Sequence, residues 1–199
     1  EEATRSGKIV FELENVNYQV GEKVLVRDFS AQVQRGDKIA LVGPNGCGKT
    51  TLLKSISARL APQRGQILYR PQAGQEQDLY AMAESDRRRL LRTDWGVVHQ
   101  HPMDGLRRQV SAGGNIGERL MATGARHYGN IRATAEKWLQ EVEIPPSRID
   151  DLPTTFSGGM QQRLQIARNL VTQPKLVFMD EPTGGLDVSV QARLLDLLR

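Results

Sequence analysis

The sequence has one cysteine, Cys47, and no apolar run of the roughly 18 residues that a membrane-spanning helix needs. A single cysteine excludes an internal disulfide, which agrees with a reducing compartment. The first residues, EEATRSGK, are polar and acidic, whereas a secretory signal is basic and then apolar. We therefore expect a cytoplasmic protein that has no membrane segment of its own.

Neither sign of charge dominates, since 27 Lys and Arg stand against 23 Asp and Glu, for a net charge of +4. This excess is too small to predict a nucleic-acid partner, although it suits a protein that handles anionic ligands. With 199 residues, of which 39% are hydrophobic, the chain can bury a core and form one domain plus a subdomain.

The hydrophobic pattern changes character along the chain. Period-two alternation in VFELENV and DFSAQVQ predicts half-exposed antiparallel strands, whereas the continuous apolar runs KIALVG and KLVFMD predict strands buried on both faces. Helical spacing predicts helices at residues 50–61, 85–92 and 157–171 and within 107–144, with Ser85 and Ser157 as N-caps. This mixture predicts an α/β fold.

The strongest chemical signal is GPNGCGKT, residues 43–50, which fits the phosphate-binding loop pattern of glycine, four residues and then Gly-Lys-Thr. Because the loop precedes a predicted helix, its backbone N–H groups and the helix N-terminus can face phosphates. Lys49 can reach the β and γ phosphates, and Thr50 can ligate Mg²⁺. The predicted nucleotide-binding residues here are Gly43, Pro44, Asn45, Gly46, Cys47, Gly48, Lys49, Thr50 and Thr51.

Two adjacent carboxylates, Asp180 and Glu181, end the apolar run LVFM. If such a pair stood alone, its default interpretation would be a solvated strand end or a helix cap. Together with Lys49 and Thr50, it predicts that Asp180 holds Mg²⁺, usually through water, and that Glu181 polarises the attacking water.

A third element is FSGGMQQR, residues 156–163, at the start of a predicted helix. With the phosphate loop, Gln100 in VVHQHP, the Asp-Glu strand and GGLD in the same order, the chain resembles the ATP-binding cassette (ABC) family over nearly all of its length. This resemblance implies a P-loop NTPase core with an antiparallel β subdomain and an α-helical subdomain, and it implies ATP and Mg²⁺ as cofactors.

The resemblance also assigns roles to individual residues. Gln100 would link the metal to the helical subdomain and, with Lys49 and Glu181, contribute to catalysis; the implied metal ligands are Thr50, Gln100 and Asp180. The signature residues would contact a nucleotide held by a second ABC domain, in a homodimer or with a related cassette. They are Ser157, Gly158, Gly159 and Gln161, and Asp187 belongs to the D-loop.

Tyr18, in NVNYQV, corresponds to the aromatic residue that stacks on adenine in the family. A tyrosine at a strand end is also typical of an amphipathic rim, so both interpretations stay open at this position.

Two branches of the family are represented in one chain. Residues 1 to about 51 resemble the second cassette of ABC-F proteins, whereas residues from about 52 onward resemble the ATP-binding subunit of bacterial carbon-phosphorus lyase. A chimera joined inside KTTLLK, or a natural lyase subunit with a diverged front end, would explain this. The implied partner is the carbon-phosphorus lyase core complex, with a ribosome or nucleic acid as the alternative, although the arginines of SDRRRLLR are more typical of a solvated helix face.

The family has a switch histidine beyond GGLD, but His99, His101 and His127 all precede the Asp-Glu strand. We therefore expect a C-terminally incomplete cassette that binds ATP better than it hydrolyses it. One cassette would comprise residues 1–100 as β and P-loop core, 101–172 as helical subdomain and 173–199 as Asp-Glu strand, D-loop and helix. The open hypotheses are an ATPase, a nucleotide-gated interaction module and a permease-coupled importer.

Overall fold

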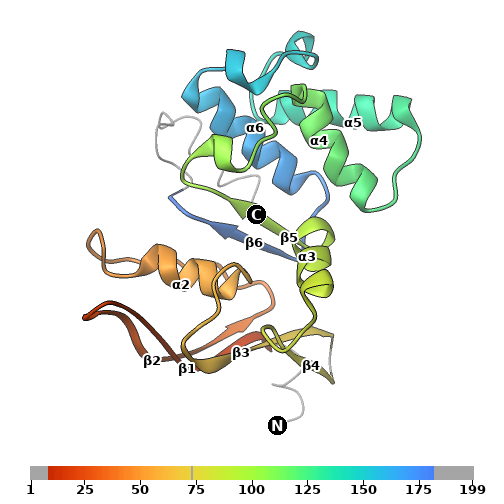
Figure 1. The fold of residues 1–199 in the computed structure, drawn as a ribbon. Helices are drawn as coiled ribbons and strands as arrows, with labels where there is room; N and C mark the ends of the chain where they lie inside the picture. The colour runs from red at the N-terminus through yellow and green to blue at the C-terminus, as the bar shows by residue number, and fades with distance from the viewer. Residues whose placement is uncertain (1–8, 73, 182–199) are drawn as a thin grey trace. The chain divides into compact units, whose positions relative to one another are not determined.

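A computed structural model describes residues 9–72 and 74–181 (Figure 1). The chain divides into two compact units, Glu1–Arg88 and Arg89–Arg199. Within the described part of the chain, no helix is both long and apolar enough to cross a membrane.

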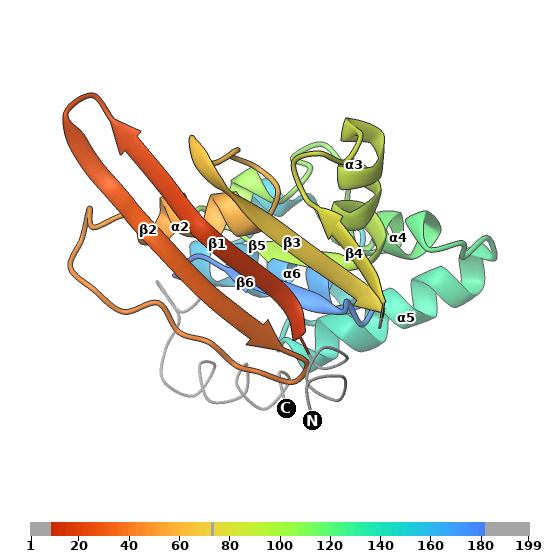
Figure 2. The ribbon, with the colours of Figure 1, turned by 90° about the horizontal axis from the view of Figure 1, so that it is seen from below.

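The first unit is built on a four-stranded antiparallel sheet in the order β2-β1-β3-β4, which Figure 2 shows edge to edge. The predicted alternation is confirmed, because Phe11, Leu13 and Val16 are buried while intervening positions are less so. The ring of Phe11 packs 5.2 Å from that of Tyr69 on the neighbouring strand. The strands are β1 (Ile9–Val20), β2 (Lys23–Gln34), β3 (Arg64–Gln72) and β4 (Gln75–Asp78).

Helix α2 (Lys49–Ile56) belongs to the same unit and is shorter than the predicted helix 50–61. It ends because Ala58 takes a left-handed φ of 61°, and the N–H groups of Arg59 and Leu60 both donate to the carbonyl of Lys54. The hydroxyl of Tyr80 lies 2.7 Å from the carbonyl of Leu60 and fixes this turn. Burial raises the pKa of Tyr80 to about 12.

The predicted buried strand KIALVG is not formed. Residues 38–43 have no regular structure, and Ile39 and Val42 expose 59% and 93% of their surface. A turn follows β2 directly, because Asp37 Oδ2 accepts from the N–H of Gln34 at 2.8 Å. None of the strands β1 to β4 pairs with this segment. An apolar run becomes a buried strand only where neighbouring strands complete it, so the local pattern was insufficient.

Helix α3 (Glu84–Thr93) runs from the first unit into the second. The prediction of Ser85 as its N-cap is wrong, because the helix already includes Ser85. The carbonyl of Ala83 accepts the first helical bonds, from the N–H groups of Asp86 and Arg87. Glu84 and Asp86 lie in the first turn, where acidic side chains favour a helix N-terminus.

The second unit contains a parallel strand pair, β5 (Trp95–Val98) and β6 (Leu176–Met179). The rings of Trp95 and Phe178 meet edge to face at 5.4 Å between these strands. KLVFMD thus forms the predicted strand, although only Phe178 of β6 is fully buried. A helical connection joins the two strands, as parallel pairing requires.

Three helices form that connection and cluster above the strands in Figure 1. The predicted helical faces are confirmed, since Ala135 and Leu139 pack in one core with Leu164 and Ala167. Of the short 3-10 turns that start with proline, one precedes α4 and two lie between α5 and α6. The elements are α4 (Ala112–Ala122), α5 (Tyr128–Glu141) and α6 (Gly158–Leu170), with η1 (Pro102–Asp104), η2 (Pro146–Arg148) and η3 (Pro153–Thr155).

Arg119 anchors α4 to the segment that leads into β5. Its guanidinium is buried and donates to the carbonyls of Leu91 and Trp95, each at 2.6 Å. Burial lowers the pKa of Arg119 to about 10, which reflects how completely the charge is removed from water. The position of β5 is thus fixed by a side chain as well as by its pairing with β6.

Candidate functional site

The predicted phosphate loop, residues 43–50, leads into α2 of the first unit. Gly46 and Gly48 take left-handed φ values of 76° and 102°, which residues with a side chain rarely adopt. Lys49 Nζ donates to the carbonyl oxygens of Gly43 at 2.6 Å and Pro44 at 2.9 Å. The lysine amine therefore lies against its own loop, and the predicted loop residues are brought together.

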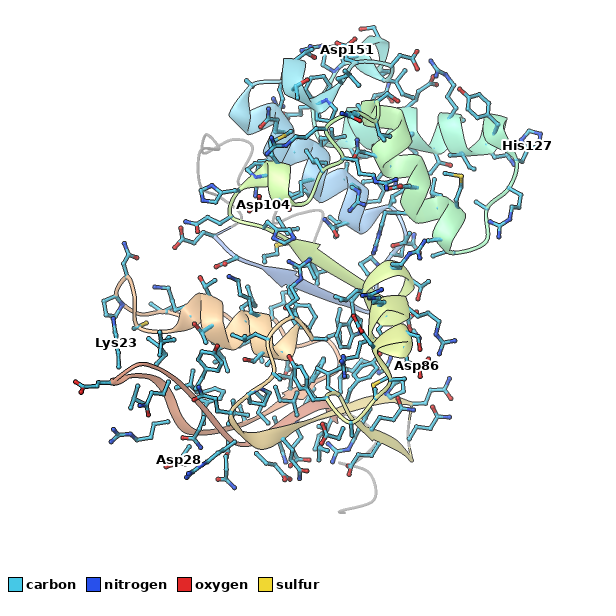
Figure 3. The ribbon with its side chains drawn as sticks, viewed as in Figure 1. Lys23, Asp28, Asp86, Asp104, His127 and Asp151 are labelled. Carbon is cyan, nitrogen blue, oxygen red and sulfur yellow. The ribbon has the colours of Figure 1, made fainter. Side chains whose placement is uncertain are left out.

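A second amine lies beside this loop and was not predicted. Lys23 Nζ is 3.6 Å from the position that a Cβ on Gly46 would occupy, and Figure 3 labels Lys23 next to the loop that precedes α2. Lys23 starts β2 at the β1–β2 hairpin. No sequence motif marks this lysine, since only the antiparallel pairing brings the hairpin to the loop.

Tyr18 lies on the same hairpin, opposite Val26 in the β1–β2 ladder, and is half-buried. The structure places it in the unit that carries the phosphate loop. Adenine stacking by this ring stays a prediction.

Gln100 and Glu181 meet at the carboxyl ends of the parallel strands β5 and β6. Gln100 Nε2 donates to Glu181 Oε2 at 2.8 Å, and the N–H of Asp180 donates to the carbonyl of Val98 at 3.0 Å. Glu181 is exposed and has a left-handed φ of 46°. Such a conformation costs a non-glycine residue about 1–3 kcal/mol and is concentrated at functional sites.

The signature segment forms the N-terminus of α6. The predicted cap is confirmed, because Ser157 Oγ accepts from the N–H of Met160 at 3.3 Å. Ser157 and Gly158 are exposed, and among the described residues, apart from the adjoining ones and the backbone of α6 itself, nothing lies within 4 Å of a Cβ built on Gly158. Gln161 Nε2 donates to the carbonyl oxygen of Phe156 at 3.0 Å and so holds the preceding loop. The start of α6 is therefore held by hydrogen bonds and exposed at Ser157 and Gly158.

Gly159 is half-buried in the first turn of α6. Asp187 lies outside the described residues.

The predicted metal ligands suit Mg²⁺ by their chemistry. Thr50 offers a hydroxyl, Gln100 an amide oxygen and Asp180 a carboxylate, and Mg²⁺ prefers hard oxygen ligands that act together with substrate phosphates and water. Thr50 belongs to the first unit, whereas Gln100 and Asp180 belong to the second.

Buried amides on α6 were missed by the sequence analysis. Gln165 Oε1 accepts from the N–H of His99 at 2.6 Å, and Gln165 Nε2 donates to the carbonyl of His99 at 3.1 Å. One turn further, Asn169 Oδ1 accepts from the N–H of Val97 at 3.0 Å. The available signal was the spacing of Gln162, Gln165 and Asn169, which puts three amides on one face of the helix.

The relatives of this chain among known proteins include two from one organism. Over 172 residues, the chain is 78% identical to PhnK of Escherichia coli (strain K12), an ATP-binding protein named provisionally for phosphonates utilization; the match covers 86% of this chain and 66% of PhnK. It is 39% identical over 198 residues to the ATP-binding protein Uup of the same organism, which covers 100% of this chain and 27% of Uup. The chain thus spans less than two thirds of either relative, and both predicted resemblances are confirmed.

Solved structures agree with these relatives. A dimeric post-hydrolysis structure of the ATP-binding cassette MJ0796, bound to ADP and Pi, superposes with a TM-score of 0.84 at 26% identity. The match covers 94% of this chain and 81% of that chain. That the chain is a chimera, with its first and later residues derived from different branches of the family, stays a prediction.

The family model described as ABC transporter matches residues 26–184. The chain therefore belongs to the ABC transporter family, and its fold is the predicted α/β P-loop NTPase fold of an ATP-binding cassette, with an antiparallel β sheet and a helical part.

Proposed function

We propose that the chain binds Mg²⁺ and ATP and hydrolyses ATP to ADP and phosphate. The observation that carries the proposal is the hydrogen bond from Gln100 to Glu181, because it holds a carboxylate in a fixed orientation at the end of β6. The left-handed glycines and Lys49 of the phosphate loop support nucleotide binding in the same chain.

Each residue has a defined part in the reaction. Lys49 stabilises negative charge on the β and γ phosphates, and Glu181 accepts a proton from water as the water oxygen bonds to the γ phosphorus. The bond from that phosphorus to the ADP oxygen breaks. Thr50, Gln100 and Asp180 would hold Mg²⁺, which supplies charge neutralisation on the phosphate oxygens when bound.

A second cassette completes the site in this proposal. The exposed start of α6 supports it, because Ser157, Gly158, Gly159 and Gln161 can then contact a nucleotide bound to the partner. The MJ0796 cassette was solved as a dimer, which supports head-to-tail pairing.

The proposed cellular role is in a phosphonate-degrading carbon-phosphorus lyase system, with that enzyme's core complex as the partner. The support is the 78% identity to PhnK, whose name refers to phosphonates utilization. A cassette of this kind would transmit the energy of ATP hydrolysis to the complex on which it docks.

Phosphate release tests the proposal. We would measure release from Mg-ATP over a range of protein concentrations for the parent chain, for Glu181→Gln and for Glu141→Gln, a control glutamate of α5. Activity should rise more than linearly with concentration, vanish in Glu181→Gln and persist in the control. ATP binding without release would instead indicate a nucleotide-gated interaction module, and equal loss in both variants would refute the role of Glu181.

A further inference from the structure

Gln165 holds both polar backbone groups of one residue, His99, which directly precedes Gln100. Its amide oxygen accepts from the His99 N–H at 2.6 Å, and its amide nitrogen donates to the His99 carbonyl at 3.1 Å. Two opposed hydrogen bonds fix the peptide planes on either side of His99. From this geometry we infer that Gln165 is a positioning residue that sets the orientation of Gln100 and, through it, of Glu181.

The surroundings of Gln165 leave this side chain little freedom. Gln165 is fully buried, and a Cβ on Gly105 would lie within 2.4 Å of its amide oxygen. The loop that carries Gln100 is therefore hydrogen-bonded to α6 before Gln100, at His99, and approaches α6 closely after it, at Gly105. A buried amide whose donors and acceptor are satisfied has one preferred geometry, because breaking its bonds leaves polar groups without water.

A continuous series of contacts leads from α6 to the proposed base, Glu181. Gln165 Nε2 also lies 3.2 Å from Gln162 Oε1, on the turn nearer the signature segment. Gln165 is hydrogen-bonded to His99, and the residue after His99, Gln100, donates to Glu181 at 2.8 Å. This inference rests on the proposed function, since a change in the orientation of Glu181 would lower ATP turnover only where Glu181 is the base.

Asn169 provides a matched comparison on the same helix face. It is also buried and also accepts a hydrogen bond from a backbone N–H, that of Val97, at 3.0 Å. Val97 lies within β5, where pairing with Phe178 holds the strand independently. Loss of the Asn169 amide thus removes a similar interaction without releasing the segment next to Gln100.

The test compares Gln165→Met with Asn169→Leu, since each change keeps most of the side-chain volume and removes the amide. Two quantities are measured for each variant: steady-state ATP turnover and the NMR resonances of the Gln100 side-chain amide. For Gln165→Met we expect kcat to fall by about tenfold or more, with KM nearly unchanged, as for other residues that orient a catalytic group. The Gln100 resonances should also move, whereas Asn169→Leu should change neither quantity.

Equal losses of kcat in the two variants, or unchanged Gln100 resonances in Gln165→Met, would overturn the inference. If Gln165→Met does not fold, Gln165→Glu takes its place with the same two measurements, because it keeps the side-chain length and the acceptor for His99. If the parent chain shows no turnover, the proposed function fails separately. The Gln100 resonances then decide the positioning role alone: a shift supports it and no shift refutes it.

Discussion

The carbonyl oxygen of Leu25, in β2, lies 2.5 Å from the position that a Cβ on Gly48 would occupy. Gly48 also has a φ of 102°, and it caps the N-terminus of α2. The strand backbone therefore passes so close to the phosphate loop that only glycine fits there. We expect Gly48→Ala to abolish ATP binding and to lower the free energy of unfolding by about 2 kcal/mol or more, because it combines a steric clash with backbone strain.

A matched control separates the two costs. Gly36 has a comparable φ of 88°, but in the part of the chain that the structure describes, nothing beyond its two neighbours lies within 4 Å of its Cβ position. Gly36→Ala should therefore cost only the strain, about 1 kcal/mol, and leave ATP binding intact. Isothermal titration with ATP and urea unfolding measure both effects, and equal losses of binding in the two variants would contradict the prediction.

Ser157→Ala should reduce stability and ATP turnover, and Ser111→Ala should reduce only stability. Both serines cap helices by accepting a backbone hydrogen bond, Ser157 at α6 and Ser111 at α4. Loss of either cap should cost about 1 kcal/mol in chemical unfolding. Turnover per folded molecule should fall only for Ser157, which the proposal places against the partner's nucleotide. A similar decrease in both variants would assign the effect to folding.

Lys23→Met should weaken ATP binding, because the amine near Gly46 adds positive charge to the phosphate loop. For an exposed charge we expect about 1 kcal/mol, or about a fivefold rise in Kd, and a smaller effect at high salt. Lys54→Met, in the last turn of α2, is the control and should leave Kd unchanged. The Kd for ATP of both variants is measured by titration at two ionic strengths. Equal changes of Kd in Lys23→Met and Lys54→Met would contradict a role of Lys23 at the phosphate loop.

The ion pair of Asp94 and Lys175, with 2.7 Å between the amine and a carboxylate oxygen, should make stability pH-dependent. Burial alone would raise the pKa of Asp94, but hydrogen bonds from Lys175 and Thr93 outweigh it and hold this pKa below its ordinary value of 3.8. The folded protein thus binds protons at Asp94 less readily than the unfolded chain does. The stabilisation is complete above the unfolded pKa and is lost as the pH falls through the lower folded pKa.

A double-mutant cycle of Asp94→Asn and Lys175→Met measures this contribution. Because Lys175 is more than half exposed, we expect a coupling free energy of only about 0.5 kcal/mol at pH 7. It should approach zero well below pH 3.8, although the backbone bond from the Lys175 N–H to the Asp94 carbonyl persists. A coupling that is independent of pH would show that the charge of Asp94 does not matter.

Local signals in the sequence predicted the elements whose neighbours lie close in the chain. The alternation in β1 and β2 and the cap at Ser157 depend on contacts within a hairpin or one helical turn, and both were correct. The prediction of a buried strand at residues 38–43 was wrong, because a strand buried on both faces depends on pairing with strands distant in the sequence. The local pattern carries no information on those partners. The prediction of Ser85 as an N-cap was wrong because several residues near the start of a helix can act as its cap.

The candidate site shows the same division. The predicted phosphate loop is contiguous, so one motif names all of its residues together, and their binding of nucleotide stays a prediction. Glu181 was assigned from the carboxylate pair that ends LVFM, whereas Gln100 was assigned by resemblance. Their contact requires the parallel pairing of β5 and β6. Gln165 was missed because a glutamine in a helix ordinarily faces water, and only the packed structure shows that this one is buried.

Cys47 lies exposed in the phosphate loop and is the only thiol in the chain. A thiol-reactive dye can therefore modify the protein at one atom, and the label reports on that loop without any engineered cysteine. Because a bound nucleotide would shield this sulfur, the rate of alkylation can serve as a footprint of site occupancy. The same exposure opens the sulfur to oxidants, so such labelling is done on protein kept with a reducing agent until the dye is added.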